Sequence, residues 1–573
     1  MGLIQKIAII GGGPAGLIAA ESLARQKGQN WEIVGFEARG QLGGVWGDSP
    51  GSNTGSREVF EQLRTLERFD EPLDPSRIFQ EGSALVKNGR ISDLRPLLAT
   101  SVDKPMRVKR IPQLRDGFIF SAKTGVYENL MTNTPGELMN MDLTDLSHSS
   151  KRDDIAPLED LQQVQEDIRG FVEKNPSSKV FRRHTYVEYL DKLSPEKWIL
   201  VAKRSEPDSE NDYWYSDTFD AVIIANGHFL CPYLPFYMTS NSDDGNNIHE
   251  FNKRFPKTLT HVRDLDVWFR ERLPVVQKDS ATSKQKVVIV GKSFSAMDIL
   301  KRLIPLQDAN HDLEIIVSVR TPPMPDNQAN PFRWFDRWLT QTAKVTTVCA
   351  ISRFFEHQGT PALQLEDGTV IQDLSAVVFA TGYVYTFPFV SNKLLESYRI
   401  LVTPDPRNTN GTPSNVSRVT GLYLHTFSIA DPTMGFVGIS SNANFQSFHI
   451  SALALSGTWA KLNTLYDSQN PKDGPIYDSI WSQVLPSIQE QLQWARERLL
   501  RTGNNGAYHF YYPVVLLKQQ WLQLCEPLFS DEARQHQLFP HDSAEKAQRG
   551  LERLEDLFFK TVDPEELCSR GQN

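Results

Sequence analysis

The sequence predicts an α/β fold with two dinucleotide-binding, Rossmann-like domains, one inserted in the other, followed by a helical C-terminal extension. Two glycine-rich turns carry this prediction, because each directly follows a short apolar strand. The turns are Gly11-Gly12-Gly13-Pro14-Ala15-Gly16 and Gly291-Lys292-Ser293-Phe294-Ser295-Ala296. The 573 residues are enough for two or three domains. Two such turns indicate two dinucleotides that meet in one active site, which favours redox chemistry.

The first turn carries the stronger signal. It follows the strand 6–10 in a βαβ unit that covers residues 1 to about 47. Gly11 permits a tight turn, Gly13 lets the backbone approach a pyrophosphate, and Gly16 lets the next helix pack closely on the sheet. We expect that helix at 17–27, with its N-terminal amides and positive dipole directed at the phosphates.

An acidic residue and a second glycine-rich loop follow the first turn. The strand 32–36 ends at Glu37, where a carboxylate usually holds a ribose hydroxyl and disfavours a 2′-phosphate. The loop after it reads Gln41-Leu42-Gly43-Gly44-Val45-Trp46. Its two glycines would let the backbone lie against a flat ring or a pyrophosphate. A plain loop with a core tryptophan is the alternative.

Composition excludes several classes of function. The formal net charge of −9 argues against nucleic acid or an anionic membrane as the main partner. The four cysteines (Cys231, Cys349, Cys525 and Cys568) are far apart and form no CxxC, so we expect free thiols and neither a dithiol centre nor a cysteine zinc site. The chain enters a core strand almost at once and has no apolar stretch of membrane-spanning length. These features predict a cytoplasmic protein with no integral membrane segment.

The rest of the chain predicts further elements with weaker signals. Residues 49 to about 125 are interpreted as an insertion over the surface with the placement of a lid. An amphipathic helix is predicted after Pro157 from the stripe Leu158, Leu161, Gln165, Ile168 and Val172. Strands are predicted at 198–202, 219–225, 376–380 and 435–439, and helices at 487–500 and 544–558.

The second turn departs from the ideal pattern. It follows the strand 287–290, with Ser293 in place of the middle glycine and Ala296 in place of the last. Both residues are small, so close approach remains possible, and the hydroxyls of Ser293 and Ser295 could bond phosphate. We expect the helix 295–303 to follow.

Arg320 occupies the position in the second unit that Glu37 occupies in the first. It ends the predicted strand 313–319. An arginine there suits a 2′-phosphate through paired charge-assisted hydrogen bonds, and Lys292 would assist. A surface arginine without a ligand is the alternative.

The order GxGxxG, glutamate and GGxW resembles the flavin-containing monooxygenase family. In that family the first site holds FAD, and the GGxW segment lies along it. The resemblance therefore implies FAD at the first turn. At the second turn, Arg320 stands at the position equivalent to Glu37, which favours NADPH there. The resemblance covers roughly residues 5 to 465.

The segment from Tyr127 to Pro135 resembles the family pattern Y-x-x-L-x-x-N-x-P. By that resemblance Asn133 is the candidate catalytic residue beside the flavin, with Thr132 next to it. Taken alone, an asparagine before Thr-Pro is more typical of a turn.

A third segment resembles the family pattern FxGxxxHxxx(F/Y). Phe255 and His261 match, whereas Lys257 replaces the glycine and Leu265 replaces the aromatic residue. The segment supports the superfamily but does not choose the reaction. The resemblance implies that His261 orients NADP, although an isolated histidine is more often structural.

Two segments predict crossover points between the domains. Residues 379–383 match the family segment FATGY, and 225–228 are a looser counterpart. The predicted domains are the first part of the FAD domain at 1–230, the NADPH domain at 231–375, the second part of the FAD domain at 376–465 and the C-terminal extension at 466–573.

The resemblance implies a monooxygenase that uses FAD, NADPH and O2 to oxygenate the sulfur or nitrogen of a small molecule. A C4a-hydroperoxyflavin would transfer the oxygen atom, with bound NADP+ and Asn133 shielding it from water. Baeyer–Villiger oxygenation of ketones remains an alternative, and a non-catalytic nucleotide-binding module is another. The missing CxxC disfavours a disulfide reductase.

Overall fold

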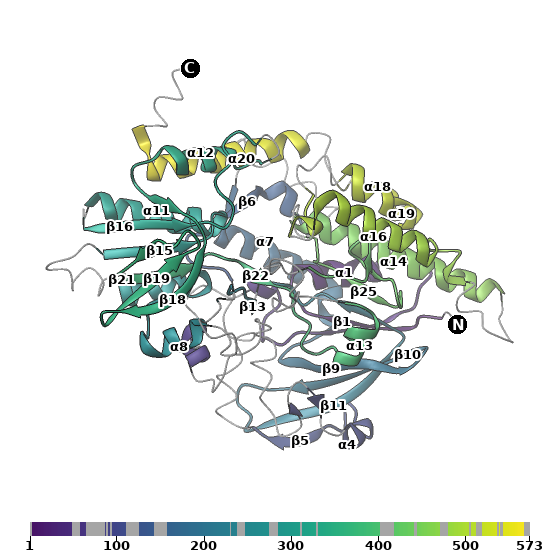
Figure 1. Cartoon of the computed structure of the whole chain (residues 1–573). Helices are drawn as coiled ribbons and strands as arrows, with labels where there is room; N and C mark the ends of the chain where they lie inside the picture. Colours follow the sequence, from purple (N-terminus) through teal and green to yellow (C-terminus); the bar gives the residue numbers. More distant parts are fainter. Residues whose placement is uncertain are drawn as a thin grey trace.

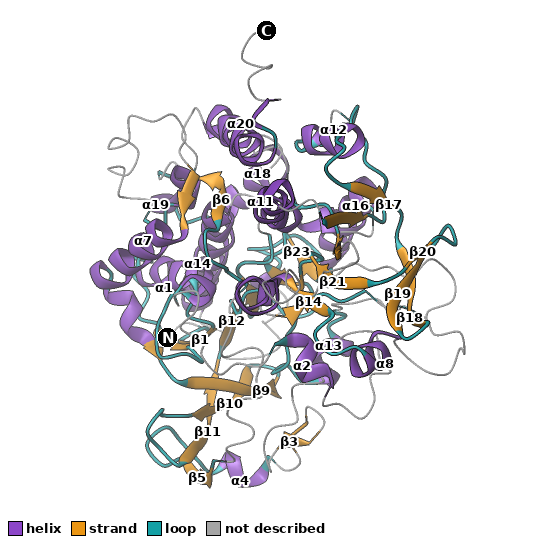
Figure 2. Ribbon diagram, turned by 90° about the vertical axis from the view of Figure 1, so that its left-hand side faces the viewer, coloured by secondary structure: helices purple, strands orange, loops and turns teal. Residues whose placement is uncertain are grey.

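A computed structural model (Figure 1) gives the structure of the chain, and Figure 2 shows its helices and strands from a second side. It is a mixed α/β protein with two mainly parallel sheets, so the predicted fold class is confirmed. The structure describes residues 3–47, 58–64, 86–87, 90–91, 94–110, 125–142, 158–229, 231–235, 237, 247–273, 285–309, 312–327, 330–400, 418–440, 444–469, 480–503, 506–511, 518–535, 538 and 543–565.

The first sheet has seven strands in the order β23-β24-β25-β12-β1-β2-β8. Its strand β1 (Lys6–Ile10) pairs in parallel with β2 (Glu32–Phe36) and β12 (Ala221–Ile224). Residues 7–10 are buried, as expected for a parallel strand covered on both faces. The other strands are β8 (Phe181–Arg182), β23 (Leu422–Tyr423), β24 (Phe427–Ser428) and β25 (Met434–Phe436).

The second sheet has five parallel strands in the order β14-β21-β15-β16-β17. All of them come from the chain between β12 and β23 of the first sheet, so the predicted insertion of one unit in the other is confirmed. The strands are β14 (Leu259–His261), β15 (Gln285–Val290), β16 (Leu313–Ser318), β17 (Thr346–Val348) and β21 (Leu374–Phe379).

The two connections between the units lie side by side. The short strand β13 (Cys231–Pro232) on the outgoing connection pairs with β22 (Tyr383–Val384) on the return. Both segments predicted as crossover points therefore lie at the place where the chain passes between the sheets.

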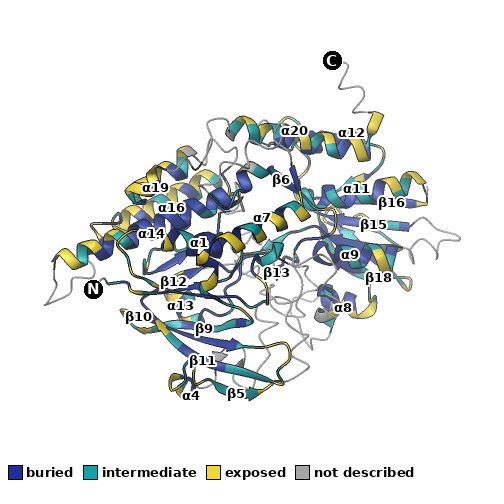
Figure 3. Cartoon of the chain, turned by 180° about the vertical axis from the view of Figure 1, so that it is seen from behind, coloured by how far each residue is buried: buried dark blue, intermediate teal, exposed yellow. Residues whose placement is uncertain are grey.

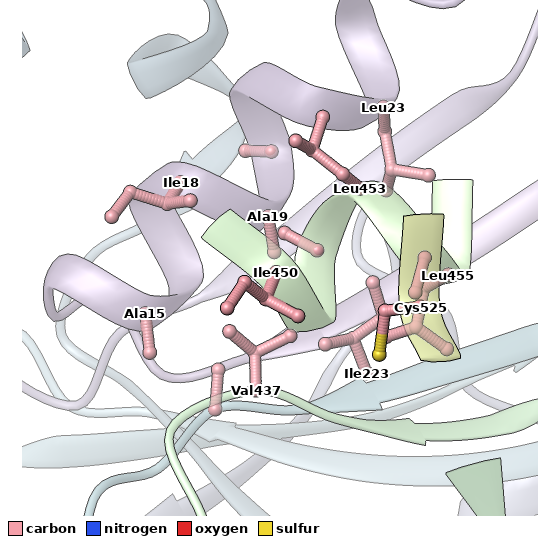
Figure 4. Close-up of a cluster of buried hydrophobic side chains, with 14 of the residues drawn as sticks. Ala15, Ile18, Ala19, Leu23, Ile223, Val437, Ile450, Leu453, Leu455 and Cys525 are labelled. Atoms are coloured by element: carbon pink, nitrogen blue, oxygen red, sulfur yellow. The ribbon is translucent and has the colours of Figure 1, made fainter. Parts of the chain in front are cut away.

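One core lies between the first sheet and the helices that cover it. Helix α1 (Pro14–Ala24) packs against α14 (Asn444–Gln469). In Figure 4, Ala19 of α1 lies next to Ile450 of α14, and both belong to the same buried cluster. This packing holds α1, and with it the first glycine-rich turn, against the sheet.

A four-stranded antiparallel sheet, β5-β11-β10-β9, extends from the first unit at the bottom of Figure 2. Its strands are β5 (Met106–Lys109), β9 (Thr185–Ser194), β10 (Lys197–Arg204) and β11 (Asn211–Phe219). Of these, the sequence predicted only the centre of β10.

The predicted single strand 219–225 is wrong, because Asp220 divides it. Phe219 ends β11, and β12 begins at Ala221. The Oδ2 atom of Asp220 accepts hydrogen bonds from the amides of Gln5 (3.0 Å) and Lys6 (2.9 Å). The chain changes sheets at this carboxylate.

The predicted start of the helix at Leu158 is also wrong. Residues Leu158–Asp160 form β7, and helix α7 covers Leu161–Lys174. Asp160 caps the helix, because its side chain accepts from the amide of Gln163 at 2.9 Å. Figure 3 shows α7 with one buried and one exposed side, as its apolar stripe predicted.

Within the stretch 49 to about 125, which the sequence suggested to be a surface insertion, apolar residues of helix α2 (Val59–Arg64) and Leu97 are buried in cores. Helix α2 places Val59, Phe60 and Leu63 in a core of the second unit, where Phe60 stacks on Phe379. Leu97 packs against the antiparallel sheet. The rest of the proposed lid lies mostly outside the described residues.

The remaining elements complete both units and the helical extension. Helix α11 (Phe294–Ala309) is longer than predicted and contains Pro305. Within the described residues no helix is long and apolar enough to cross a membrane. The other α-helices and strands are β3 (Val86–Lys87), β4 (Arg90–Ile91), α4 (Arg95–Leu98), β6 (Met131–Pro135), α8 (Asn247–Arg254), α9 (Leu265–Val267), α12 (Arg333–Gln341), β18 (Ile351–His357), β19 (Thr360–Leu365), β20 (Val370–Ile371), α13 (Asn392–Ser397), α16 (Ile488–Thr502), α18 (Gln523–Cys525), α19 (Asp531–Arg534) and α20 (Ser543–Val562).

Candidate cofactor and active site

The first glycine-rich turn is closely packed. Gly11 has a φ of +109°, which favours glycine, and a Cβ there would overlap the carbonyl oxygen of Ala225. A Cβ on Gly16 would overlap the carbonyl oxygen of Gly11. At Gly13, by contrast, the nearest atom to an added Cβ is the Cα of Gly44 at 3.4 Å. Gly11 and Gly16 therefore shape the turn, whereas Gly13 leaves room beside the N-terminus of α1.

Glu37 is buried beneath this turn. Its Oε2 accepts from the amide of Gly12 at 2.8 Å, and its Oε1 accepts from the amide of Arg39 at 2.8 Å. Each carboxylate oxygen has a second acceptor site, so these bonds do not prevent a ribose hydroxyl from donating to the same group. The carboxylate also orients the turn.

The GGxW loop lies directly on the turn. Gly43 donates its amide to the carbonyl of Gly12 at 2.9 Å, and a Cβ on Gly44 would lie 2.9 Å from the Cα of Gly13. Val45 and Trp46 follow in a short 3₁₀ helix (Gly44–Trp46), with Trp46 half-buried against the first core. The loop and turn thus form one glycine-lined surface, as a closely approaching dinucleotide requires.

The second turn repeats the backbone of the first. Gly291 has a φ of +114°, and its amide donates to Ser318 at 2.9 Å, as Gly11 does to Phe36. A Cβ on Gly291 would lie 2.7 Å from the carbonyl oxygen of Ala380. The carbonyl of Ser293 accepts from two amides of α11, and its side chain is exposed. The serine therefore does not disrupt the turn.

The other residues of the second turn are placed as follows. Ser295 is half-buried in the first turn of α11, and Ala296 is buried where the first unit has Gly16. The ring of Phe294 packs edge-on against Phe332, with centroids 4.6 Å apart. Phe294 therefore anchors the turn within the protein.

Lys292 has a partner within the protein. Its Nζ lies 2.6 Å from Oδ1 of the buried Asp336, whose Oδ2 accepts from the amide of Met324. The charge of Lys292 is thus balanced by a carboxylate before any phosphate approaches. Sequence reasoning missed this pair, because Asp336 lies on α12 and no motif connects the two residues.

Arg320 is exposed just beyond the carboxyl end of β16. Within the described chain its guanidinium has neither a hydrogen-bond partner nor a salt bridge, in contrast to Lys292. Tyr233 lies nearby; burial raises the pKa of its phenol and the charge of Arg320 opposes that shift. Sequence reasoning missed Tyr233, which no local motif marks.

His261 is completely buried at the end of β14. Its Nε2 lies 3.1 Å from the carbonyl oxygen of Gly382, and its Nδ1 accepts from the amide of Arg263 at 3.1 Å. A carbonyl only accepts, so the proton is assigned to Nε2. Burial lowers the pKa of His261 to about 3, which keeps the ring neutral. Through its hydrogen bond to Gly382, the imidazole fixes the start of the connection that returns to the first sheet.

Asn133 is exposed on β6, which pairs with β7 around an irregularity. Met131 pairs with Asp160 and Pro135 with Leu158, and the register shifts between them. Such a bulge redirects a side chain. The adjacent Thr132 is buried, and its hydroxyl accepts from the amide of Glu159 at 2.9 Å.

A chain of buried histidines links the extension to the first unit. His509 accepts from the amide of Val419 at Nε2, so its Nδ1 donates to Nδ1 of His425 at 3.2 Å. The Nε2 of His425 then donates to Tyr511 at 2.8 Å. Burial lowers the pKa of both imidazoles well below the usual range, and of His228, beside Gly438, to about 4.

Acid is therefore expected to destabilise the folded chain. In the unfolded chain His228 and His261 take up protons near pH 6.5, whereas in the folded chain they do so only near 4 and 3. Their contribution to stability is present above pH 6.5 and falls as the pH drops toward those values. By about pH 5, each of these two histidines lowers the free energy of unfolding by roughly 2 kcal/mol relative to neutral pH. Thermal unfolding followed by circular dichroism at pH 7 and 5 measures this; an unchanged midpoint would contradict it.

Comparisons with known proteins agree with this arrangement. The sequence pattern of the NAD(P)-binding Rossmann-like domain matches residues 9–59. The flavin-containing monooxygenase iboF of Amanita muscaria is 26% identical over 81% of this chain and 80% of its own length. The trimethylamine monooxygenase of Roseovarius is 25% identical over 70% and 66%. The structure of S-allyl-L-cysteine S-oxygenase from Allium sativum shares the fold, with a TM-score of 0.56, 16% identity and coverage of 99% and 98%.

Proposed function

From the premise that this chain belongs to the flavin-containing monooxygenase family, we propose that it oxygenates a sulfur or nitrogen atom of a small molecule. It is an NADPH-dependent flavin monooxygenase with FAD and NADPH as cofactors. One atom of O2 goes to the substrate and the other leaves as water, while NADPH and a proton are consumed. The observation that carries the proposal is that the first turn has a buried acidic residue, Glu37, where the second has an exposed basic residue, Arg320.

The first turn fits FAD. The N-terminus of α1 has no acidic residue in its first turn, and the Cα of Gly13 faces the glycines of the GGxW loop. The amides there would hold the pyrophosphate, and Glu37 would accept from the ribose. When bound, FAD supplies the oxygen activation, so the protein needs neither a nucleophile nor a metal. Within the described residues no cluster of metal-ligating side chains is present.

The second turn fits NADPH through Arg320. Its exposed guanidinium can form paired hydrogen bonds to a 2′-phosphate. Because Lys292 is paired with Asp336, we propose that Arg320 distinguishes NADPH from NADH. Ser293 and Ser295 would bond the pyrophosphate, and Tyr233 would lie beside the adenosine end of the cofactor.

His261 has a positioning part in this proposal. Its hydrogen bond to Gly382 fixes the return connection next to β14, so it acts on the cofactor through the backbone. It does not transfer a proton, because a group with a pKa of about 3 is unprotonated at neutral pH and both nitrogens are occupied.

Asn133 is proposed to protect the oxygenating state of the bound cofactor from water. An Asn133→Ala variant should oxidise NADPH while releasing mainly H2O2, because the amide that excludes water is lost. Peroxide and oxygenated product measured together with NADPH consumption test this. Peroxide leakage equal to that of the wild type would remove Asn133 from the mechanism.

One experiment tests the proposed function as a whole. NADPH consumption is measured with FAD present over a thioether, a tertiary amine and a cyclic ketone, with H2O2 measured alongside. We expect turnover with the thioether or amine. Turnover of the ketone alone would instead establish Baeyer–Villiger oxygenation, and a colourless protein that fails to bind FAD would leave only a non-catalytic module.

A further inference from the structure

The strand that carries Asn133 is attached to the second unit at its beginning. Tyr127, six residues earlier in the chain, is buried in the core of the second unit with Val262, Leu265 and Trp268. Its hydroxyl donates to Oδ2 of Asp298 at 2.6 Å. Asp298 lies on α11, the helix that begins at the second glycine-rich turn. One side chain thus connects the start of β6 to the helix of the second nucleotide site.

Further contacts fix the same attachment. Arg302, one turn beyond Asp298 on α11, lies over the Tyr127 ring at 5.6 Å and donates to the carbonyl oxygen of Glu128. Its Nη1 is 3.2 Å from Oδ1 of Asp266, whose Oδ2 accepts from the amide of Glu128 at 2.9 Å. The second unit therefore holds the backbone before β6 as well as the side chain of Tyr127.

The C-terminal helix α20 holds the other end of β6. A Cβ on Gly550 would lie 2.8 Å from Cγ of Pro135, the last residue of β6, so the helix and the strand are in direct contact. Eight residues after Gly550 the helix enters the second core. There Phe558, Phe559 and Val562 join Trp334, Phe335 and Trp338 of α12.

Helix α20 also reaches the first core, because Ala547 packs against it. In Figure 1, α20 runs beside α12 and passes over β6. A helix of 20 residues is about 30 Å long, enough to contact both units and the strand between them.

Asn133 lies between these two attachments. The bulge of β6 leaves its side chain exposed, while Thr132 bonds to β7, which leads into α7 of the first unit. Movement of the second unit would shift both ends of β6 against this bond. Asn133 is the exposed residue of the strand on which that movement would act.

We propose that Tyr127 and α20 are positioning elements that couple NADP+ binding at the second site to the position of Asn133. Tyr127 transmits the state of α11 to the start of β6, and Gly550 lets α20 hold its end. Only the chemical consequence at Asn133 rests on the proposed function; the mechanical coupling does not. Coupling is reciprocal, so loosening β6 should also weaken NADP+ binding.

Hydrogen exchange tests the coupling without turnover. In the FAD-loaded protein, NADP+ should slow amide exchange in a peptide that covers residues 131–135. Tyr127→Phe removes only the hydroxyl, and it should reduce that protection about tenfold, as expected for a hydrogen bond to a charged acceptor. Tyr189→Phe is the matched control, because Tyr189 also donates to an aspartate (Asp191, 2.8 Å) but lies in the antiparallel sheet. Equal protection in wild type and Tyr127→Phe would overturn the proposal.

The glycine contact gives a second, independent test. Gly550→Ala places a methyl group against Pro135 and should lower the protection of β6. Gly170→Ala is the control, because Gly170 also lies within a helix but has no atom within 4 Å of an added Cβ. If NADP+ protects β6 from exchange in Gly550→Ala to the same extent as in Gly170→Ala and the wild type, α20 has no positioning role.

Turnover measurements distinguish the proposed oxygenation from the coupling of the second site to β6. Tyr127→Phe should raise the share of NADPH electrons released as H2O2. Asp298→Asn keeps an acceptor for the phenol, so it should retain most of the coupling. A wild type that protects β6 on NADP+ binding but never oxygenates a substrate would refute the proposed function and leave the coupling standing. Oxygenation with unchanged peroxide release and unchanged exchange in Tyr127→Phe would refute the coupling alone.

Discussion

A Gly13→Val variant should fold and yet be isolated without FAD. The φ of −76° at Gly13 is open to any residue, and the nearest atom to an added Cβ is 3.4 Å away, so the backbone of the turn accommodates a Cβ. The branched side chain would then occupy the space beside the amides of α1. If the overlap costs about 3 kcal/mol, at the upper end for overpacking, FAD affinity falls about a hundredfold.

The flavin absorbance of the purified protein measures this effect, with circular dichroism as the check on folding. Gly16→Val provides the contrast, because its Cβ would overlap the carbonyl of Gly11 and should disrupt the turn itself. Gly170→Ala should keep its FAD. A yellow Gly13→Val protein with normal FAD content would show that the pyrophosphate does not lie against this residue.

An Arg320→Ala variant should lose its preference for NADPH. The paired hydrogen bonds between a guanidinium and a phosphate are worth roughly 1.5–3 kcal/mol, so KM for NADPH should rise about 10- to 150-fold while KM for NADH changes little. Steady-state kinetics with both nucleotides measure the difference.

Two variants sharpen this prediction. Arg337→Ala removes an exposed arginine from α12 of the same unit and should leave the preference intact. Lys292→Ala would leave the buried carboxylate of Asp336 without its cationic partner, so we expect it to reduce protein stability. Equal changes in KM for NADPH and NADH in Arg320→Ala would mean that Arg320 does not recognise the 2′-phosphate.

The local backbone rules of the fold could be predicted from the sequence. Gly11, Gly16 and Gly291 are glycines because a Cβ would meet backbone atoms there, and those contacts lie within the units that the turns define. The strands before both turns are short, apolar and buried, as parallel strands covered on both faces must be.

Long-range partners could not be predicted. Asp220 ends one strand because it accepts from amides far away in sequence, and Leu158 joins a strand because β6 is there to pair with it. The apolar residues of α2 looked like part of a loop, since the core that buries them comes from residues 234–379. Helical periodicity in 544–558 gave the helix but not its position across both units.

The same difference between local motifs and long-range contacts applies to the residues of the site. Glu37 and Arg320 follow from their places at strand ends, which the motif spacing gives. The engagement of Lys292 by Asp336 and of His261 by two backbone groups depends on residues brought together only by the fold. A residue type at a motif position therefore predicts where a site lies. It does not predict whether that side chain is free to contact the cofactor or is already bonded within the protein.

The fate of the oxygen atoms of O2 tests whether this chain oxygenates a substrate. The purified chain is supplied with FAD, NADPH, a thioether and O2 labelled with heavy oxygen, and the sulfoxide is analysed by mass spectrometry with NADPH consumption measured in parallel. We expect one labelled oxygen atom in the sulfoxide for each NADPH oxidised, less the fraction recovered as H2O2. NADPH oxidation that yields only H2O2 with thioethers and amines, or a sulfoxide without label, would contradict this expectation.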